Sequence, residues 1–195
     1  MVLSHPGAQD RGPVDSTHDA RFARECARGS DPVLFYEHIA LYRDPQIKQI
    51  LSEEPPAALP IGRAALRRSG TDLVLVSYGA YVHVCLRVAQ TLAGEGVDAA
   101  VLDLRTLAPL DRDAILALAR HRSRPHRARR HPHPPGGIGE SIAAVIQEEA
   151  FSALDAPVAI VGSLDTPVPY SPSLEEAFLP GEHGIEQAAR ALLAY

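Results

Sequence analysis

Cysteine, tryptophan and lysine are scarce in this 195-residue sequence, which has two cysteines, no tryptophan and a single lysine, Lys48. Cys26 and Cys85 stand far apart and neither belongs to a CxxC pair, so the sequence indicates neither a zinc site nor a disulfide framework. Each cysteine is therefore predicted to serve as a small, buried apolar residue.

The sequence also lacks the apolar segments that membranes require. It contains no run of about 18 apolar residues, which argues against a membrane-spanning helix. Residues 1–18 are polar, contain several glycines and prolines, and have no apolar centre like that of a signal peptide. These absences predict a cytoplasmic protein in a reducing compartment, with an irregular start and no membrane partner.

The charge balance is mildly acidic. Against 19 basic residues stand 24 acidic ones, which gives a net charge of −5. Domains that bind nucleic acid usually carry a basic excess, so we do not expect nucleic acid as a partner of the whole chain.

Apolar runs and helical patterns alternate along the chain. Runs such as LVLVSY are typical of strands covered on both faces, and Asp111 is expected to cap the helix that follows it. The alternation predicts an α/β fold with a parallel sheet between helices. A proline cluster near Pro55–Pro60 predicts a boundary between residues 1–58 and residues 59–195. We expect strands over 32–38, 73–78, 99–104 and 158–163, and helices over 19–28, 80–94, 111–120, 140–154 and 184–195.

One segment interrupts this alternation. Between Arg120 and Pro135 stand six arginines, four histidines and four prolines, at the place where the pattern requires a buried strand. Prolines remove donors from a strand ladder, and unpaired arginines are costly to bury. We therefore expect a central strand to be damaged over 121–134.

Three interpretations are open for this Arg/His stretch. A nucleic-acid patch normally has aromatic platforms, and this stretch has none. A metal site needs ligands held on a frame, whereas His126, His131 and His133 alternate with cations that repel a metal. The third interpretation, which we favour, is a local reading-frame error. Residues 126–134 can be encoded as CAC CGT GCT CGT CGT CAC CCA CAC CCG, and removing the first base gives Thr-Val-Leu-Val-Val-Thr-His-Thr, which reads as the missing strand.

Two long segments make the sequence similar to a known family. LPIGRAALRRSGTDLVLVSYGAYVHVCLRVAQTLAGEGVDAAVLDLRTLAPLD and GGIGESIAAVIQEEAFSALDAPVAIVGSLDTPVPYSPSLEEAFLP closely resemble the β subunit of thiamine diphosphate-dependent 2-oxoacid dehydrogenases, the pyruvate, branched-chain and acetoin enzymes. DPVLFYEHIALYR continues the resemblance upstream, so that it covers residues 30–195 apart from 120–135. It implies a transketolase-like C-terminal domain at 59–195, preceded by the tail of a pyrimidine-binding domain. The implied fold is a three-layer α/β/α arrangement whose mostly parallel sheet has one antiparallel edge strand.

The resemblance also implies cofactors that this chain is not expected to bind alone. In the family, thiamine diphosphate with magnesium lies between an α subunit and the pyrimidine-binding domain of the β subunit. A glutamate there activates the cofactor, and a histidine lies near the substrate. Both precede the part of the family sequence that DPVLFYEH matches, and Glu25 and His18 are not their counterparts. We therefore assign no catalytic, cofactor-binding or metal-binding residue.

The role that the resemblance leaves to this chain is assembly. The family's C-terminal domain packs in a heterotetramer with an α subunit and a second β subunit, and it docks the subunit-binding domain of the lipoyl acyltransferase core. The family's docking groups correspond here to Asp155 and the C-terminal carboxylate of Tyr195, whose negative charges suit a small basic module. We expect a truncated β subunit that assembles and docks but is inactive on its own.

Two other functions are kept as alternatives: a C-terminal fragment of a transketolase or deoxyxylulose phosphate synthase, and a freestanding interaction module for a basic partner. The sequence GGIGE at 136–140 resembles a loop that cradles phosphate, but we expect it to serve close packing and a tight turn. His83 is expected to be structural. Arg105 could face a site at the end of a strand, or pair with Asp103 or Asp111.

Overall fold

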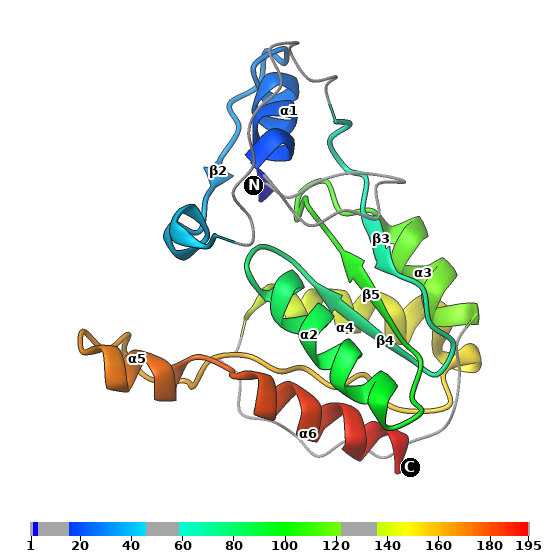
Figure 1. Ribbon diagram of the computed structural model, residues 1–195. Helices are drawn as coiled ribbons and strands as arrows, with labels where there is room; N and C mark the ends of the chain where they lie inside the picture. The colour runs from blue at the N-terminus through cyan, green and yellow to red at the C-terminus, as the bar shows by residue number, and fades with distance from the viewer. Residues whose placement is uncertain (1, 4–15, 46–58, 122–135, 195) are drawn as a thin grey trace.

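The apolar runs at 73–78 and 99–104 form the parallel centre of the sheet in the computed structural model, which describes residues 2–3, 16–45, 59–121 and 136–194 (Figure 1). Strand β4 (Leu73–Ser77) pairs in parallel with β5 (Ala99–Asp103), in a register from Leu73 opposite Ala99 to Ser77 opposite Asp103. Strand β3 (Ala65–Arg68) pairs with the other edge of β5 in the antiparallel sense, so the strand order is β3-β5-β4. The α/β fold class and the antiparallel edge strand are confirmed.

Helices follow the strands as the sequence predicts. Asp111 caps α3 as expected, since its Oδ1 accepts a hydrogen bond from the backbone N–H of Ala114 at 3.2 Å. The helices of this part of the chain are α2 (Tyr81–Gly94), α3 (Arg112–His121), α4 (Ile138–Ala150), α5 (Pro172–Phe178) and α6 (Glu182–Leu193), and a short 3-10 turn, η2 (Phe151–Ala153), follows α4.

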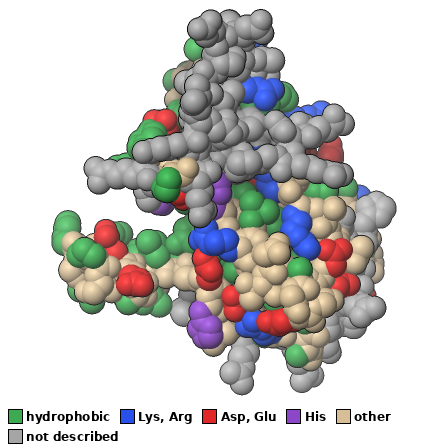
Figure 2. All heavy atoms as spheres, in the orientation of Figure 1, with side chains coloured by type: hydrophobic (Ala, Val, Ile, Leu, Met, Phe, Trp, Pro, Cys, Tyr) green, Lys and Arg blue, Asp and Glu red, His purple; other side chains and the backbone are tan. Residues whose placement is uncertain are grey.

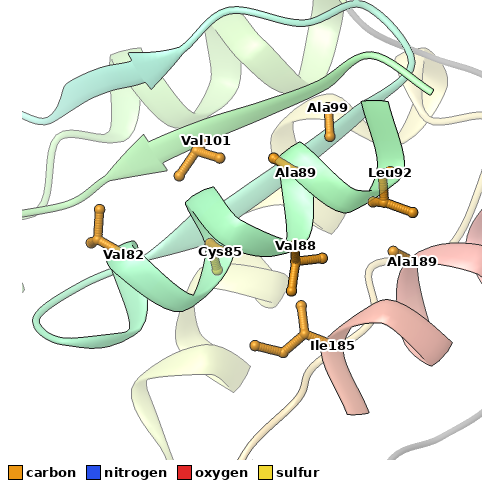
Figure 3. Packing of buried hydrophobic residues seen from close by; sticks show 9 residues of the cluster. All are labelled: Val82, Cys85, Val88, Ala89, Leu92, Ala99, Val101, Ile185 and Ala189. Atoms are coloured by element: carbon orange, nitrogen blue, oxygen red, sulfur yellow. The ribbon is translucent and has the colours of Figure 1, made fainter. Parts of the chain in front are cut away.

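Alternate residues of β5 serve two separate cores, because successive side chains of a strand point to opposite faces. Ala99 and Val101 pack with apolar residues of α2 and α6 (Figure 3). Leu102, and Leu104 just after the strand, pack with apolar residues of α3 and α4 on the other face. All five residues of β5 are buried, so this strand is the centre of the fold.

The N-terminal part makes a smaller unit. Helix α1 (Ser16–Cys26) starts three residues before the expected position, and Phe22 packs with Leu59 in a small core of its own. The strand expected over 32–38 is reduced to β2 (Phe35–Tyr36), which pairs in parallel with β1 (Val2–Leu3) and is followed by the 3-10 helix η1 (Ile39–Arg43). The domain boundary expected after residue 58 adjoins residues 46–58, which lie outside the described residues.

One expected strand is not formed. Residues 158–163 run without regular secondary structure below the sheet in Figure 1, although their sequence is as apolar as that of β4. A strand needs a neighbour to exchange hydrogen bonds with, and none of the described strands lies along this segment. The damaged strand expected over 121–134 lies outside the described residues, apart from His121 at the end of α3.

Candidate functional site

A large cavity lies beside β4. Its volume is about 730 Å³, within the range of about 300–1,000 Å³ that is common for ligand pockets. The whole of β4 lines it, together with residues 154–163, which pass on the other side. Unlike β5, β4 is only half-buried along its whole length, because its second edge is not covered by another described strand.

Helices from both faces of the sheet close the cavity. Cys85 of α2 and Ile185 of α6 contribute from one face, and Ile142 and Ile146 of α4 contribute from the other. The walls are therefore mainly apolar, and they belong to the same cores that hold the fold together. Such walls favour an apolar occupant, since burial of apolar surface is the main gain available there.

The GGIGE turn forms one end of the cavity and packs as expected. Gly136 has a positive φ of 79°, which glycine adopts without strain. Its backbone N–H donates to the carboxylate of Glu140 at 2.8 Å. A Cβ on Gly139 would lie 2.9 Å from Cγ2 of Ile160, so only glycine lets α4 approach residues 157–163 this closely.

Asp155, the predicted docking residue, lies at the rim of this cavity. It is exposed in the bend that follows η2 and is among the residues lining the cavity. The other predicted docking group, the carboxylate of Tyr195, lies outside the described residues. The turn after α4 and the end of α6 lie toward the same side of the view in Figure 1.

A buried charged cluster lies at the carboxyl end of β5. Asp103 Oδ2 accepts a hydrogen bond from Nε of Arg67 at 3.1 Å, and the two side chains are 0% and 2% exposed. Asp103 Oδ1 accepts from the backbone N–H of Arg105 at 3.1 Å, and Nη1 of Arg105 donates to the carbonyl of Arg63 at 3.3 Å. The guanidinium bonded to Asp103 is thus that of Arg67 on β3, rather than that of Arg105.

Arg105 in this cluster has a lowered pKa. The pKa of Arg105 is lowered to about 10, mainly by burial; nearby Arg67 and Arg21 contribute to the fall, while Asp103 and Asp111 oppose it. Both terminal nitrogens of Arg67, and Nε and Nη2 of Arg105, are buried without a hydrogen-bond partner. Arg67 of β3 donates to Asp103 of β5, and Arg105 donates to the carbonyl of Arg63. The cluster therefore holds β3 against β5 at the edge of the sheet.

The thiols are poor nucleophiles. Cys85 is buried, as expected, and burial raises the pKa of its thiol to about 11, although a hydrogen bond with Ser77 opposes the shift. Cys26 is half-buried and its pKa is also raised, mainly by burial. His83 is half-buried on α2. Because the thiolate is the reactive form, both cysteines act as packing residues at neutral pH.

Neither a metal-binding cluster nor a membrane-crossing helix occurs in the described part of the chain. Within residues 2–3, 16–45, 59–121 and 136–194, no three His, Cys, Asp or Glu side chains come together in a way that could hold a metal ion. Over the same residues, no helix has the length and apolar character needed to cross a bilayer.

An apolar arm projects from the domain after residue 163. It carries α5, which extends away from the sheet in Figure 1, and Figure 2 shows apolar and acidic side chains gathered on it. Its acidic residues are Asp165, Glu175 and Glu176. Monomeric proteins rarely expose large contiguous apolar patches, so such an arm is typical of an interface. The exposed large apolar residues of the arm are Leu164, Val168, Tyr170, Leu174 and Leu179.

Several of these features were missed by sequence reasoning. Nothing in the letters ALRR marks Arg67 as a buried partner of Asp103, because arginine is normally an exposed residue. The DLRT motif gave a usable signal for Asp103 and Arg105. No single segment of the sequence predicts the cavity, because residues from several helices and strands along the chain line it together.

Comparison with known proteins gives a consistent result. Residues 62–185 match the family described as transketolase, C-terminal domain. Among curated proteins, the chain is 35% identical over its whole length to 2-oxoisovalerate dehydrogenase subunit beta of Bacillus subtilis, covering 59% of that protein. It is 37% identical to the pyruvate dehydrogenase E1 component subunit beta of the same organism, again over all of this chain and over 58% of that protein.

A third curated relative acts on another substrate. It is the acetoin:2,6-dichlorophenolindophenol oxidoreductase subunit beta of Cupriavidus necator, 39% identical over 85% of this chain and 48% of that protein. Among solved structures, one described as "Split gene transketolase, inactive beta4 tetramer" superposes with a TM-score of 0.69 at 22% identity, over 99% of this chain and 58% of that one. The chain thus spans about half to three-fifths of the length of these relatives.

Proposed function

Because the chain belongs to the transketolase C-terminal domain family, we propose that it is the C-terminal part of the β subunit of a 2-oxoacid dehydrogenase. Its role is assembly and docking within the decarboxylating component of that complex. The observation that carries the proposal is the match along this whole chain to proteins named as β subunits of such enzymes. The proposed partners are an α subunit, a second β subunit and the lipoyl acyltransferase.

Thiamine diphosphate and magnesium would belong to the assembled enzyme. The described residues do not fit these groups, since no cluster of His, Cys, Asp or Glu is placed to hold a metal ion among them. Cys85, which lines the large cavity, stays protonated at neutral pH. We therefore derive no chemical step for this chain, and its contribution is made through its surfaces.

The apolar arm supports a role in assembly. Tyr170 is fully exposed, and Val168 and Leu174 are more than half exposed. Burying such side chains in a subunit interface would remove apolar surface from water at about 25 cal/mol per Å². A neighbouring α or second β subunit is the partner that we propose for this arm.

Asp155 supports docking to a basic module. It is exposed at the rim of the cavity, so its carboxylate can reach a partner without rearrangement of the domain. We propose that Asp155 and the terminal carboxylate of Tyr195 steer and orient the subunit-binding domain of the acyltransferase. Opposite charges across an interface mainly set orientation and association rate, and they weaken with salt.

Calorimetric titration of the chain with that subunit-binding domain tests the docking proposal. Asp155→Ala should weaken binding by about 1–3 kcal/mol at low salt, and the difference should shrink at high salt. Asp165→Ala removes another exposed carboxylate, on the arm, and serves as the matched control, with unchanged affinity expected. Equal affinities for the parent chain, Asp155→Ala and a variant extended after Tyr195 would refute the docking assignment.

A transketolase subunit is the second candidate function. The superposition on a solved structure described as a split-gene transketolase favours it, although at 22% identity the likeness concerns the fold alone. The same titration separates the two candidates, since a transketolase has no lipoyl acyltransferase partner to bind.

A further inference from the structure

Two buried arginines flank the carboxylate of Asp103 at the carboxyl end of β5. Oδ2 of Asp103 accepts a hydrogen bond from Nε of Arg67, and Oδ1 accepts one from the backbone N–H of Arg105, both at 3.1 Å. The guanidinium of Arg105 donates instead from Nη1 to the carbonyl of Arg63 at 3.3 Å. In open α/β sheets ligands bind beyond the carboxyl ends of the strands, so the two arginines lie at a place where a ligand is expected.

Each arginine presents one pair of nitrogens that has no hydrogen-bond partner in the described part of the chain. The pair is Nη1 and Nη2 in Arg67, and Nε and Nη2 in Arg105. The Arg67 side chain is 2% exposed and Arg105 is 0% exposed, so bulk water does not reach these nitrogens. Buried N–H groups without a partner are costly, and buried charges are costlier still. Both guanidiniums are therefore suited to take a further acceptor.

The backbone of Arg105 gives a second, independent observation. Its φ is 55°, in the left-handed region, and among the described residues no other non-glycine has a positive φ. Residues held in sparsely populated conformations cluster at ligand clamps and active sites. The next residue, Thr106, is also 0% exposed, and its hydroxyl has no partner within the described residues. One bend after β5 thus gathers several buried donors that the fold does not use.

Arg21 of α1 adds a third cation near the pair. The pKa of Arg105 is lowered mainly by burial, and Arg67 and Arg21 contribute to the fall. Asp111, one of the two aspartates that oppose it, is already engaged, since its oxygens accept from two backbone N–H groups at 2.9 and 3.2 Å. Arg21 is only half-buried. The side of α1 is therefore the route by which a small ion can reach the buried pair.

We propose that Arg67 and Arg105 form a binding site for one small tetrahedral oxyanion, inorganic phosphate or sulfate. Two nitrogens on one edge of a guanidinium match two oxygens of such an ion, and its four oxygens can serve two guanidiniums together. Because the chain itself covers these nitrogens, a free ion fits the site better than a side chain of a partner subunit. The site is separate from the docking and assembly surfaces proposed above.

Equilibrium dialysis of the full chain against radiolabelled inorganic phosphate tests the site, with sodium chloride holding the ionic strength constant. We expect saturable binding of one phosphate per chain, and competition by unlabelled sulfate, whose relative affinity shows which of the two ions the site prefers. Glycerol phosphate should not compete, because the closed site excludes its glycerol group. Binding should also raise the melting temperature, as for any ligand held by the folded state alone. No saturable binding, or equal competition by glycerol phosphate, would overturn the proposal.

Arg105→Lys tests the residues of the site. Lysine keeps the positive charge and the backbone bond to Asp103 but has no edge with two nitrogens, so phosphate should bind at least about tenfold more weakly. Arg68→Lys is the matched control: its side chain on β3 is 26% exposed and pairs with Asp98, and we expect unchanged affinity. Parent-like affinity in Arg105→Lys, or equal weakening in both variants, would refute the assignment.

A spectroscopic measurement on the unaltered chain covers the case in which Arg105→Lys does not fold. In a chain with isotope-labelled arginine, the Nε–H groups of buried arginines exchange with water slowly, and those of exposed arginines exchange fast. Phosphate should shift slowly exchanging signals at the concentrations at which dialysis shows binding. Shifts confined to the fast-exchanging signals would contradict the proposal, since the ion would then lie on surface arginines.

Discussion

Asp103→Asn keeps the size of a buried side chain but removes the charge that two arginines share. Asp103 bonds Nε of Arg67 and the backbone N–H of Arg105, both at 3.1 Å. The Arg67 and Asp103 side chains are 2% and 0% exposed, so water cannot replace the carboxylate without opening the structure. The asparagine oxygen can still accept one hydrogen bond, and the main change is therefore in charge.

The expected loss is large. Removing one partner of a buried ion pair costs about 3–5 kcal/mol, because the other charge stays buried without compensation. The stability of a whole domain is about 5–15 kcal/mol, so the variant should lose about a fifth of it or more. Since 1 kcal/mol shifts the melting temperature of a chain of this size by about 2–4 °C, the midpoint should fall by about 6–20 °C.

A nearby ion pair supplies the matched control. Arg68 and Asp98 are 3.1 Å apart, but their side chains are 26% and 47% exposed. Asp98→Asn should therefore cost no more than about 1 kcal/mol. Arg67→Met added to Asp103→Asn should recover part of the loss, since it removes one of the uncompensated charges.

Urea unfolding followed by far-ultraviolet circular dichroism measures all of these variants. If Asp103→Asn and Asp98→Asn lose the same small amount of stability, the assignment of Asp103 as the counter-charge of a buried cluster is wrong. The assignment would also be contradicted if Arg67→Met lowered the stability of Asp103→Asn further, by as much as an independent second substitution would.

Two further predictions concern packing and pH. Gly139→Ala should cost about 1–3 kcal/mol in urea unfolding, because its Cβ would lie 2.9 Å from Ile160. In the control Gly94→Ala, the new Cβ would meet nothing within 4 Å, so this variant should be neutral or stabilising. Equal effects of the two substitutions would contradict the close contact at Gly139. Burial raises the pKa of Cys85 from 9.0 to about 11. The stability that the protonated thiol contributes is therefore complete below pH 9 and is lost as pH rises through about 11, a fall of about 2–3 kcal/mol. Cys85→Val should flatten that fall between about pH 9 and pH 11, and an unchanged slope would show that the thiol does not titrate as described.

The elements that the sequence predicted correctly are those in which the local pattern agrees with the packing of the whole domain. The runs at 73–78 and 99–104 became β4 and β5, and Asp111 caps α3, because local pattern and tertiary packing agree there. The prediction of a strand at 158–163 was wrong, since an apolar run becomes a strand only where another strand lies beside it. Apolar content alone does not supply that neighbour.

The candidate sites were only partly predictable. Asp155 was named from the resemblance alone; the structure has it exposed in a bend, and its docking role stays a prediction. Arg67 was missed because its burial depends on Asp103, which is distant in sequence and lies on another strand. The exposed arm could not be distinguished from a buried segment, because Val168 and Leu174 are apolar residues that are usually found inside.

The most direct test of the central claim is an assay of 2-oxoacid decarboxylation by the purified chain alone, supplied with thiamine diphosphate and magnesium. Pyruvate and a branched-chain 2-oxoacid should each be offered, with an intact α and β enzyme as the positive control. The account predicts no turnover and no tight binding of thiamine diphosphate, because the chain acts through assembly and docking. Measurable turnover without an added α subunit would contradict it.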